Sequence, residues 1–424
     1  MKLWNKGIEL NQQIEAYTVG SDPQTDLYML PYDVQASAAH AKMLHKIGVL
    51  KADELKMLLS GLEEIKSLAA ENKFVIEPSD EDCHTAIEKY LTSKCGEAGK
   101  KIHTGRSRND QILVALALYQ IDQLKTVKGL VKEFAAALAK SKKKYGSIGM
   151  AGYTHMQRAM PSSVGLWLGA YADAMADNLI LIDAQLKVLD QNPLGTGAGY
   201  NIPVFNLDRQ MTAKELGFSK VQENPIYAQH ARGKFAAGTL SVLSSVMYAL
   251  NKFASDLTLF SMSEFGYAKL PAEFTTGSSI MPQKRNPDVT EMMPAQNHVV
   301  LRQEIKHKSL ISNLKFGFNR YMQLTKEPLV HSMEITKFSL SIAALLLEKT
   351  EFDKKKCEAS LTPELYATEE AYKLVKSGVP FRDAYRQVGE KYNKYKKQGL
   401  RAAPRGAGRF ISLFSFSSIP SLSV

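Results

Sequence analysis

The chain has 424 residues, of which 45% are hydrophobic and 23% are charged, and its formal net charge is +11. These proportions argue against a disordered or fibrous chain and predict a globular protein of about two or three domains with a large core. The positive charge suits either an acidic small molecule or nucleic acid as a partner. Much of the excess is crowded near the end of the chain. We interpret it as solvated charge and expect no nucleic-acid partner.

The three cysteines, Cys83, Cys95 and Cys357, are scattered and form no CxxC pair. This argues against a disulfide framework or a zinc site and favours a reducing compartment. The first residues include no apolar run typical of a secretory signal, and no stretch approaches the roughly 18–20 apolar residues of a membrane span. We therefore expect a cytoplasmic protein with no membrane partner.

The first part of the chain is expected to be helical. Residues 33–50 and 53–72 are predicted as two short helices, and the second has acidic residues in its first turn, where the helix dipole favours them. A third helix is predicted over 85–91. His84 and Glu88 lie one turn apart at its start, and no third ligand stands at helical spacing. A capping or salt-bridge role is therefore favoured over a metal site.

The middle of the chain is predicted to form long helices. Apolar residues recur every three or four positions over 164–189, 240–257 and 329–347, and more loosely over 112–138. Such stripes pack as nearly parallel helices, and no alternating pattern of comparable length indicates strands. The predicted fold class is all-α, built around a central bundle of long helices. One chain leaves helix faces of such a bundle uncovered, which favours a homo-oligomer.

Three domains are predicted from these patterns. They are an N-terminal helical domain over 1–105, the central bundle over 106–350 and a small C-terminal domain over 351–424. After Gly399 the composition becomes rich in serine and shows no helical face. We expect this tail to be poorly ordered.

Three polar stretches stand at the ends of predicted helices. The first, over 103–111, carries Arg106, Arg108 and Asn109 just before a long helix. Two guanidinium groups suit a carboxylate-rich ligand, because guanidinium pairs bidentately with carboxylate. The start of the following helix adds backbone N–H donors. A capped helix start with solvated arginines is the structural alternative.

The second stretch, over 152–158, places His155 after a glycine-led turn. An imidazole can transfer protons near neutral pH, although a lone histidine is more often structural. The third stretch, over 277–288, has two prolines, a glycine and no amphipathic face. It gathers hydroxyls, the Lys284 ammonium and the Asn286 amide, which suit an anionic substrate that loses a proton. Its structural alternative is a polar surface loop.

A glycine-rich stretch over 195–199 has the composition of a phosphate-binding loop. It lacks the preceding strand and the following Lys-Ser/Thr pair that nucleotide-binding motifs require. We interpret it as a tight connection after Pro193.

Together, the three polar stretches resemble the signature regions of the fumarase/aspartase superfamily, and most closely those of the argininosuccinate lyase family. The resemblance runs in order from about residue 20 to about residue 390. It implies a three-domain helical fold and a homotetramer in which each active site is shared between three subunits. It also implies reversible cleavage of argininosuccinate into arginine and fumarate, in arginine biosynthesis, without a cofactor or a metal.

The resemblance assigns roles to individual residues. Ser278 takes the position of the base that removes the Cβ proton, and His155 that of its acid–base partner, although the two roles are assigned both ways in the family. Glu291 takes the position of the carboxylate that orients the histidine. Lys284 and Asn286 match groups that stabilise the substrate carboxylate. Further substrate contacts are implied at Arg108, Asn109 and Thr154, and by a looser match at Arg232, Gln323 and Lys326.

Three places depart from the family pattern. Gly20-Ser21-Asp22 replaces a segment of the Asn-Ala-Ser type, so the substrate-binding serine maps to Ser21 or to Asp22. Phe318 stands where a tyrosine is common, and Tyr321 where an acidic residue is common. These departures affect contacts to the arginine half of the substrate more than the elimination chemistry.

Two further hypotheses stay open from the sequence. One is another fumarate-forming lyase of the superfamily, acting on adenylosuccinate, aspartate or malate. The other is a non-catalytic structural homologue, against which the intact Ser278, His155 and Lys284 argue.

A serine is a poor base unless nearby positive charge or backbone N–H groups favour its anion. Lys284 and the loop at Gly277 are the candidates for that role.

Overall fold

The computed structural model describes residues 11–397, and the chain divides into two compact units. Unit 1 combines Met1–Leu130, Asn178–Tyr248 and Gln296–Phe338. Unit 2 combines Val131–Asp177, Ala249–Ala295 and Ser339–Val424. The three-domain division predicted from the sequence stays a prediction, and the tail after Gly399 lies outside the described residues.

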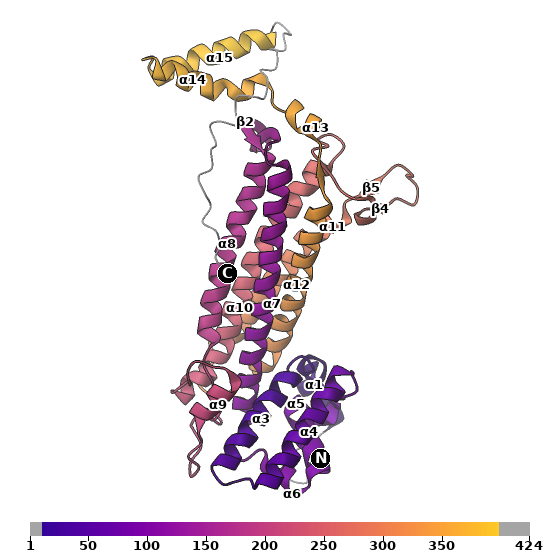
Figure 1. Ribbon diagram of the computed structural model, residues 1–424, viewed down its shortest axis with the longest axis vertical. Helices are drawn as coiled ribbons and strands as arrows, with labels where there is room; N and C mark the ends of the chain where they lie inside the picture. The colour runs from indigo at the N-terminus through magenta and orange to yellow at the C-terminus, as the bar shows by residue number, and fades with distance from the viewer. Residues whose placement is uncertain (1–10, 398–424) are drawn as a thin grey trace. The chain divides into compact units, whose positions relative to one another are not determined.

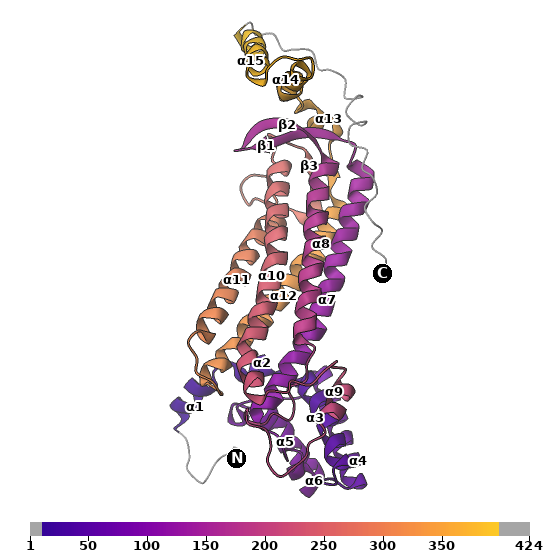
Figure 2. The ribbon, with the colours of Figure 1, turned by 90° about the vertical axis from the view of Figure 1, so that its left-hand side faces the viewer.

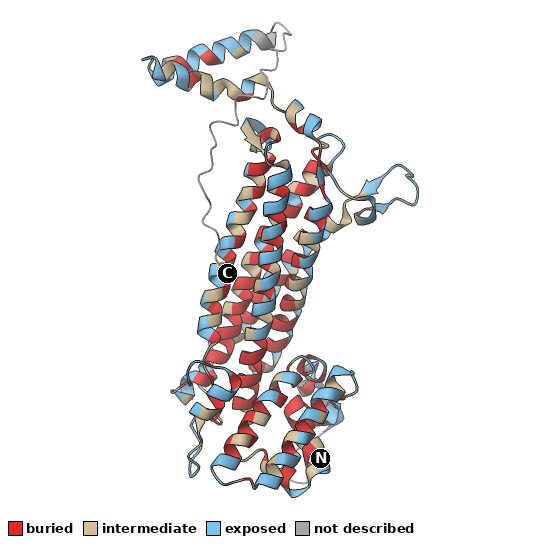
Figure 3. Cartoon of the chain, viewed as in Figure 1, coloured by how far each residue is buried: buried red, intermediate tan, exposed pale blue. Residues whose placement is uncertain are grey.

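Each of five long helices is divided between the two units. Within each unit, the five helix segments lie side by side (Figures 1 and 2). Buried residues gather where the helices face one another (Figure 3). The all-α fold class predicted from the apolar stripes is confirmed, because stripes at helical spacing bury one face of each helix. The helices are α7 (Arg108–Tyr145), α8 (Val164–Leu189), α10 (Pro225–Ser261), α11 (Asp288–Ile311) and α12 (Lys326–Lys349).

Short helices make up the rest of unit 1. They are α1 (Gln12–Val19), α2 (Asp22–Asp26), α3 (Leu30–Lys46), α4 (Ala52–Ala70), α5 (Cys83–Cys95), α6 (Glu97–Lys101) and α9 (Arg209–Leu216), with 3₁₀ turns at η1 (Pro78–Asp80) and η3 (Arg320–Thr325).

The three N-terminal helices predicted from the sequence are present with shifted ends. Helix α3 begins at Leu30 rather than at residue 33, because Pro31 fits the first turn of a helix. Helix α5 runs on to Cys95 and stops at Gly96, whose φ of +58° suits glycine. Their apolar faces meet in one buried cluster that includes Met29, Leu44, Leu58, Ile65 and Leu91.

Strands in the described residues form only two-stranded antiparallel pairs, all within unit 2. The longest pair joins β1 (Gly149–Thr154) to β2 (Gln157–Ser163). The sequence predicted only a glycine-led turn here, whereas the structure has this hairpin before α8 begins at Val164. The hairpin was missed because its strands do not alternate apolar and polar residues. The other pairs are β3 (Ala268–Lys269) with β6 (Glu351–Phe352) and β4 (Thr276–Gly277) with β5 (Arg285–Asn286).

Unit 2 has an aromatic core and a small helical hairpin. The Phe134 and Phe253 rings pack edge to face at 5.2 Å, and Trp167 stacks on Phe253 at 5.7 Å. Helices α14 (Ala367–Lys376) and α15 (Phe381–Lys397) pack through Ala371, Ala384 and Val388. The remaining elements are η2 (Ala272–Phe274), α13 (Lys354–Ala359) and η4 (Pro363–Tyr366).

One described segment, Arg320–Lys349, is long and apolar enough to span a membrane. Half of its most apolar window is buried inside the protein. Leu329, Met333 and Leu340 on this segment are among the fully buried core residues. The apolar character of the segment is therefore accounted for by packing within the bundle.

Candidate active site

The predicted loop over 277–288 is a short hairpin that leads into α11. Thr276 pairs with Asn286 and Gly277 with Arg285, so the two ends of the loop are held together. Ser278 follows directly after the first strand. Its Oγ accepts the backbone N–H groups of Ile280 at 3.3 Å and Met281 at 3.2 Å. The loop thus holds the serine oxygen against two peptide donors.

The surroundings of Ser278 favour negative charge on its oxygen. Two backbone N–H groups that donate to Oγ stabilise the alkoxide more than the hydroxyl. Lys284 is exposed on the same loop, and no ion pair within residues 11–397 holds its ammonium group. The Asn286 amide donates across the hairpin to the carbonyl of Gly277 at 3.4 Å. The loop therefore places an amide next to Gly277 and carries a cation a few residues after the serine.

His155 lies at the tip of the β1–β2 hairpin. Thr154 pairs with Gln157, and the two residues between them, His155 and Met156, have φ of +52° and +60°. Two positive φ values define a type I′ turn, which usually contains asparagine and glycine. A left-handed conformation costs a residue with a side chain about 1–2 kcal/mol. Such strain concentrates at functional sites.

Aromatic residues anchor the base of this hairpin. The hydroxyl groups of Tyr153 and Tyr267 are hydrogen-bonded at 2.7 Å. Phe265 packs edge to face against both rings, at 5.9 Å from Tyr153 and 5.4 Å from Tyr267. These contacts hold the base of the hairpin, while His155 at its tip is exposed.

Within the described part of the single chain, His155 is neither hydrogen-bonded nor ion-paired to the other catalytic candidates of unit 2. No hydrogen bond or ion pair in the described residues joins His155 to Ser278 or to Glu291, which stands in the first turn of α11. Thr154, His155, Lys284 and Glu291 are all exposed. Their chemistry is thus presented on the surface of one chain rather than assembled inside it.

In unit 1, the structure separates the two arginines of the first polar stretch. Arg106 is only 8% exposed and donates to the hydroxyl of Ser37 at 2.9 Å. Arg108 opens α7 and stays half-buried beside Asn109. Its guanidinium donates to Glu81 at 3.1 Å and to the Thr85 hydroxyl at 2.9 Å. Only Arg108 is therefore placed to exchange its partners for a ligand.

The glycine-rich stretch over 195–199 binds one of the protein's own carboxylates. Asp110 Oδ2 accepts the backbone N–H groups of Gly195 at 2.9 Å and Gly197 at 3.0 Å. Its Oδ1 accepts the N–H of Ser107 at 2.8 Å. Burial raises the pKa of Asp110 to about 6, although these bonds oppose the rise. The stretch is the tight connection that the sequence predicted, and it locks the start of α7.

Lys326 opens α12 inside a buried group of charges. Its side chain is 4% exposed, and its ammonium is 3.1 Å from Asp22 Oδ1 and hydrogen-bonded to Asp26 Oδ1. Burial alone lowers the pKa of Lys326, but Asp26 and Asp22 outweigh it, and the pKa lies above its usual value. Burial also raises the pKa of Asp22 to about 6, against the pull of Lys326.

Asp22 rather than Ser21 joins this group. Ser21 is exposed, and its carbonyl accepts the hydroxyl of Thr25 while its own hydroxyl makes no hydrogen bond within the described chain. The Gln323 amide donates to the carbonyls of Thr18 at 2.7 Å and Val19 at 2.8 Å, just before this turn. Segments about 300 residues apart in sequence therefore meet at this point.

Arg232, on α10, lies close to the same charges. It is 8% exposed, its Nη2 donates to the carbonyl of Met322 at 3.1 Å, and its guanidinium lies 5.7 Å from the Phe318 ring. Burial lowers its pKa to about 10, while Asp22 and Asp26 oppose this change. Phe318, where a tyrosine is common in the family, thus offers a ring face to this cation.

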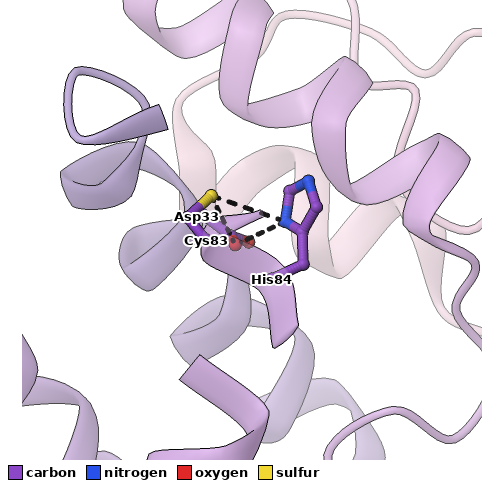
Figure 4. A group of neighbouring side chains, drawn as sticks. All are labelled: Asp33, Cys83 and His84. Atoms are coloured by element: carbon purple, nitrogen blue, oxygen red, sulfur yellow. Dashed lines mark hydrogen bonds and ion pairs between the residues drawn. The ribbon is translucent and has the colours of Figure 1, made fainter. Parts of the chain in front are cut away.

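A second buried group holds Asp33, Cys83 and His84 close together (Figure 4). The His84 Nδ1 is 2.6 Å from Asp33 Oδ2, whereas Cys83 Sγ is 3.7 Å from that oxygen and 3.8 Å from the imidazole nitrogen. Two N/O ligands of a tetrahedral zinc, each about 2.0–2.1 Å from the metal, lie about 3.3 Å apart. The distance of 2.6 Å between His84 Nδ1 and Asp33 Oδ2 is shorter than this and is that of a hydrogen-bonded ion pair. It agrees with a salt-bridge role for His84.

The sequence of the chain is similar to those of known lyases. A family model described as lyase matches residues 1–301. The chain is 49% identical over 395 residues to the argininosuccinate lyase of Thermotoga neapolitana, with 93% of this chain and 99% of that protein covered. The chain belongs to the argininosuccinate lyase family. It is also 42% identical to the argininosuccinate lyase of Phocaeicola vulgatus, over 92% of this chain and 87% of that protein.

Solved structures show the same fold. An EDDS lyase in complex with formate matches with a TM-score of 0.80 at 23% identity, covering 93% of this chain and 78% of that one. A class II fumarase from Schistosoma mansoni matches with a TM-score of 0.76 at 19% identity, covering 90% of this chain and 93% of that one. The fumarase/aspartase-like fold predicted from the sequence is thereby confirmed.

Several residues of these sites were not singled out from the sequence. Asp26, Asp110 and the Tyr153–Tyr267 pair carry no chemistry that marks them individually. For Asp110 a signal existed, since a carboxylate three residues after Ser107 at a helix start is a common capping arrangement. For Asp26 and Tyr267 the partners are distant in sequence, and only the fold brings them together.

Proposed function

We propose that this chain catalyses the reversible elimination of argininosuccinate to arginine and fumarate, as a carbon–nitrogen lyase of arginine biosynthesis. The proposal is supported by the 49% and 42% identity to argininosuccinate lyases. The structural observation that carries it is the hairpin loop in which Ser278 Oγ accepts two backbone N–H groups. Lys284 and Asn286 stand on the same loop, as an elimination that builds up negative charge requires.

Ser278 is proposed as the base. It takes the Cβ proton of the succinate part, the electron pair left on carbon forms the double bond of fumarate, and the bond between carbon and the guanidino nitrogen breaks. The leaving nitrogen keeps that bond's electron pair and receives a proton from the acid partner. His155 is the acid–base partner, with Glu291 orienting its imidazole. Preorganised cations and amides contribute several kcal/mol to such a step, on the order of 3 kcal/mol each.

The charge that develops explains the remaining assignments in unit 2. Loss of a proton beside a carboxylate places a second negative charge on that group. Lys284 and Asn286 are proposed to stabilise it, and Thr154 to contact the substrate next to His155. In unit 1, Arg108 and Asn109 are proposed as carboxylate and amide contacts, with Arg232, Gln323, Lys326 and the turn at Ser21 holding the rest of the substrate.

The active protein is proposed to be a cytoplasmic homotetramer of three-domain subunits, with each active site shared between three subunits. Supporting this, Thr154, His155, Lys284 and Glu291 are exposed in one chain, and no hydrogen bond or ion pair of the described residues joins His155 to Ser278 or Glu291. The long helices also expose large apolar side chains, among them Ile180, Ile305 and Phe338. Exposed apolar surface of this kind is typical of subunit interfaces.

The decisive experiment uses the purified full chain and follows fumarate by its ultraviolet absorbance. Steady release of fumarate from argininosuccinate is expected, with none from adenylosuccinate, aspartate or malate. Activity on adenylosuccinate alone would assign the chain to a different lyase of the superfamily. Light scattering at micromolar concentration tests the assembly, and an active monomer would contradict the shared-site proposal.

A further inference from the structure

The charged group in unit 1 contains two carboxylates with different degrees of access. Asp26 is 0% exposed, and both of its oxygens are occupied, one by Lys326 and the other by the backbone N–H of Cys83 at 3.1 Å. The side chain of Asp22 is 15% exposed. Its Oδ1 is 3.1 Å from the Lys326 ammonium, and its Oδ2 has no hydrogen bond to the side chains and backbone described over residues 11–394. Asp26 is therefore the structural partner of Lys326, and Asp22 keeps one oxygen for another donor.

The cation next to this pair is incompletely satisfied. Arg232 donates through Nη2 to a backbone carbonyl, while its buried Nε has no hydrogen-bond partner in the described structure. Buried polar groups in native proteins are nearly always paired, so an unpaired donor of this kind indicates a missing acceptor. A ligand carboxylate would supply it, because guanidinium binds carboxylate with charge-assisted hydrogen bonds.

The net charge of the group specifies the ligand further. Asp22 and Asp26 carry two negative charges, and Lys326 and Arg232 carry two positive charges. A buried group that sums to zero gains nothing from a ligand of one sign alone, because that ligand would leave an uncompensated charge. A zwitterion matches it, with its carboxylate toward the cations and its ammonium toward the free oxygen of Asp22.

We propose that Asp22 binds the α-ammonium group at the arginine end of the substrate and is a specificity-determining residue of this chain. The inference rests on the proposed function, since argininosuccinate carries an amino-acid head with both charges. A serine at this place would offer one neutral acceptor. A carboxylate makes a charged hydrogen bond instead, and bonds of that kind are roughly twice as strong as neutral ones.

The test uses the reverse reaction, in which the amine substrate can be varied. The full chain is given fumarate with either arginine or 5-guanidinopentanoate, which is arginine without its α-ammonium group. Wild type is expected to prefer arginine in kcat/KM. In Asp22→Ser and Asp22→Asn, this preference is expected to fall by about tenfold to a hundredfold, because kcat/KM for arginine falls. Loss of a hydrogen bond between charged groups typically lowers binding by such a factor.

Gln24→Ala is the matched control, because Gln24 lies exposed on α2 beside the group and belongs to no proposed site. It should keep the wild-type preference. An equal loss with both amines would show that Asp22 only holds Lys326, and this would overturn the proposal. An unchanged preference in the Asp22 variants would overturn it too.

Two further measurements separate this inference from the proposed function and from misfolding. Calorimetric titration of wild type with arginine and with 5-guanidinopentanoate compares the same contacts without turnover. Equal affinity for the two amines would overturn the role of Asp22 even if no variant folded. Failure of wild type to release fumarate from argininosuccinate would instead overturn the proposed function, and retained fumarate release with no amine preference overturns only the role of Asp22.

Discussion

Ser278 Oγ accepts the backbone N–H of Met281 at 3.2 Å, within a loop closed by the pairing of Gly277 with Arg285. The N–H of Ile280 donates to the same oxygen at 3.3 Å. These two donors are fixed by the backbone and need no rearrangement during a reaction. They lower the free energy of the serine anion relative to the hydroxyl, which is what a serine needs to act as a base.

Replacing Ser278 by alanine is expected to lower kcat by about 10²–10⁴-fold, the usual contribution of a positioned base, while KM changes little. Ser279→Ala is the matched control, because that neighbouring serine is exposed and belongs to no proposed site. It should stay within about twofold of wild type, as an exposed substitution away from special features does. Steady-state kinetics with argininosuccinate measure both. An alanine variant at 278 with near-full turnover would show that another group removes the proton.

Strain at Met156 gives a second prediction. Its φ of +60° costs about 1–2 kcal/mol, whereas glycine adopts this conformation freely but loses about 0.5–1 kcal/mol of chain entropy on folding. Met156→Gly is therefore expected to raise the free energy of unfolding by about 0.5–1 kcal/mol. Met156→Ala keeps the strained φ and should give no such gain. Urea unfolding of the two variants tests this, and equal midpoints would refute the assignment of strain.

The long helices were predictable because each apolar stripe needs only local information. The stripe predicted over 164–189 coincides with α8 (Val164–Leu189), since regular spacing marks the buried face wherever the helix packs. Helix ends were less certain, as the shift from residue 33 to Leu30 shows. A proline that fits a first turn extends a helix beyond the apolar pattern.

The partners of charged residues were not predictable in the same way. His84 pairs with Asp33, 51 positions earlier, rather than with the neighbouring Glu88. Arg106 and Arg108 are two positions apart, and one is buried on Ser37 while the other is half-exposed. Periodicity tells which side of an element is buried, but it does not tell what stands opposite.

The site residues were found through their motifs, and their surroundings only from the structure. The motif around Ser278 singled out that serine, but not the two N–H groups that face its oxygen. The choice between Ser21 and Asp22 depended on a one-residue gap, and side-chain contacts place Asp22 beside Lys326. The catalytic and binding roles themselves stay predictions.

The Asp33–His84 pair should make stability depend on pH. Burial opposes both charges, but the mutual attraction outweighs it, so the pKa of His84 lies above 6.5 and that of Asp33 below 3.8. A raised histidine pKa gives stability that is present below pH 6.5 and is lost as the pH rises through the raised value. A lowered aspartate pKa gives stability that is present above pH 3.8 and is lost as the pH falls. The pair therefore contributes most between these two values.

Asp33→Asn is expected to lower the free energy of unfolding by about 3–5 kcal/mol near pH 6, because it leaves a buried imidazolium unpaired. This loss should shrink as the pH rises through the raised pKa of His84, because the imidazole then becomes neutral in both proteins. Cys357→Ala is the control, since this buried thiol is bonded to neither Asp33 nor His84 and burial raises its pKa to about 11, so its removal should have the same effect at each pH. Denaturant unfolding of the wild type and both variants, repeated from pH 6 to pH 9, measures these differences in the free energy of unfolding. A difference for Asp33→Asn that stays constant from pH 6 to pH 9 would mean that the pair is not charged.

Asp110 links the glycine-rich connection to the start of α7, where Arg108 is proposed to bind substrate. Its carboxylate binds the N–H of Gly197 on one side and that of Ser107, directly before Arg108, on the other. Gly197 has a φ of +58°, and an added Cβ would stand 2.6 Å from the end of the Ile202 side chain. The Ile202 side chain can move aside, but the positive φ strains the same residue whose backbone N–H binds Asp110.

Gly197→Ala is expected to raise KM for argininosuccinate by roughly tenfold, with a smaller change in kcat, because misplacing a binding residue by about 1 Å is costly. Gly217→Ala is the matched control. Gly217 also has a positive φ, of +78°, but an added Cβ there meets nothing within 4 Å and no site residue depends on it. Both variants should lose about 1–2 kcal/mol of unfolding free energy through the positive φ, and only Gly197→Ala should affect KM. Equal KM values in the two variants would show that the connection stabilises the fold without positioning Arg108.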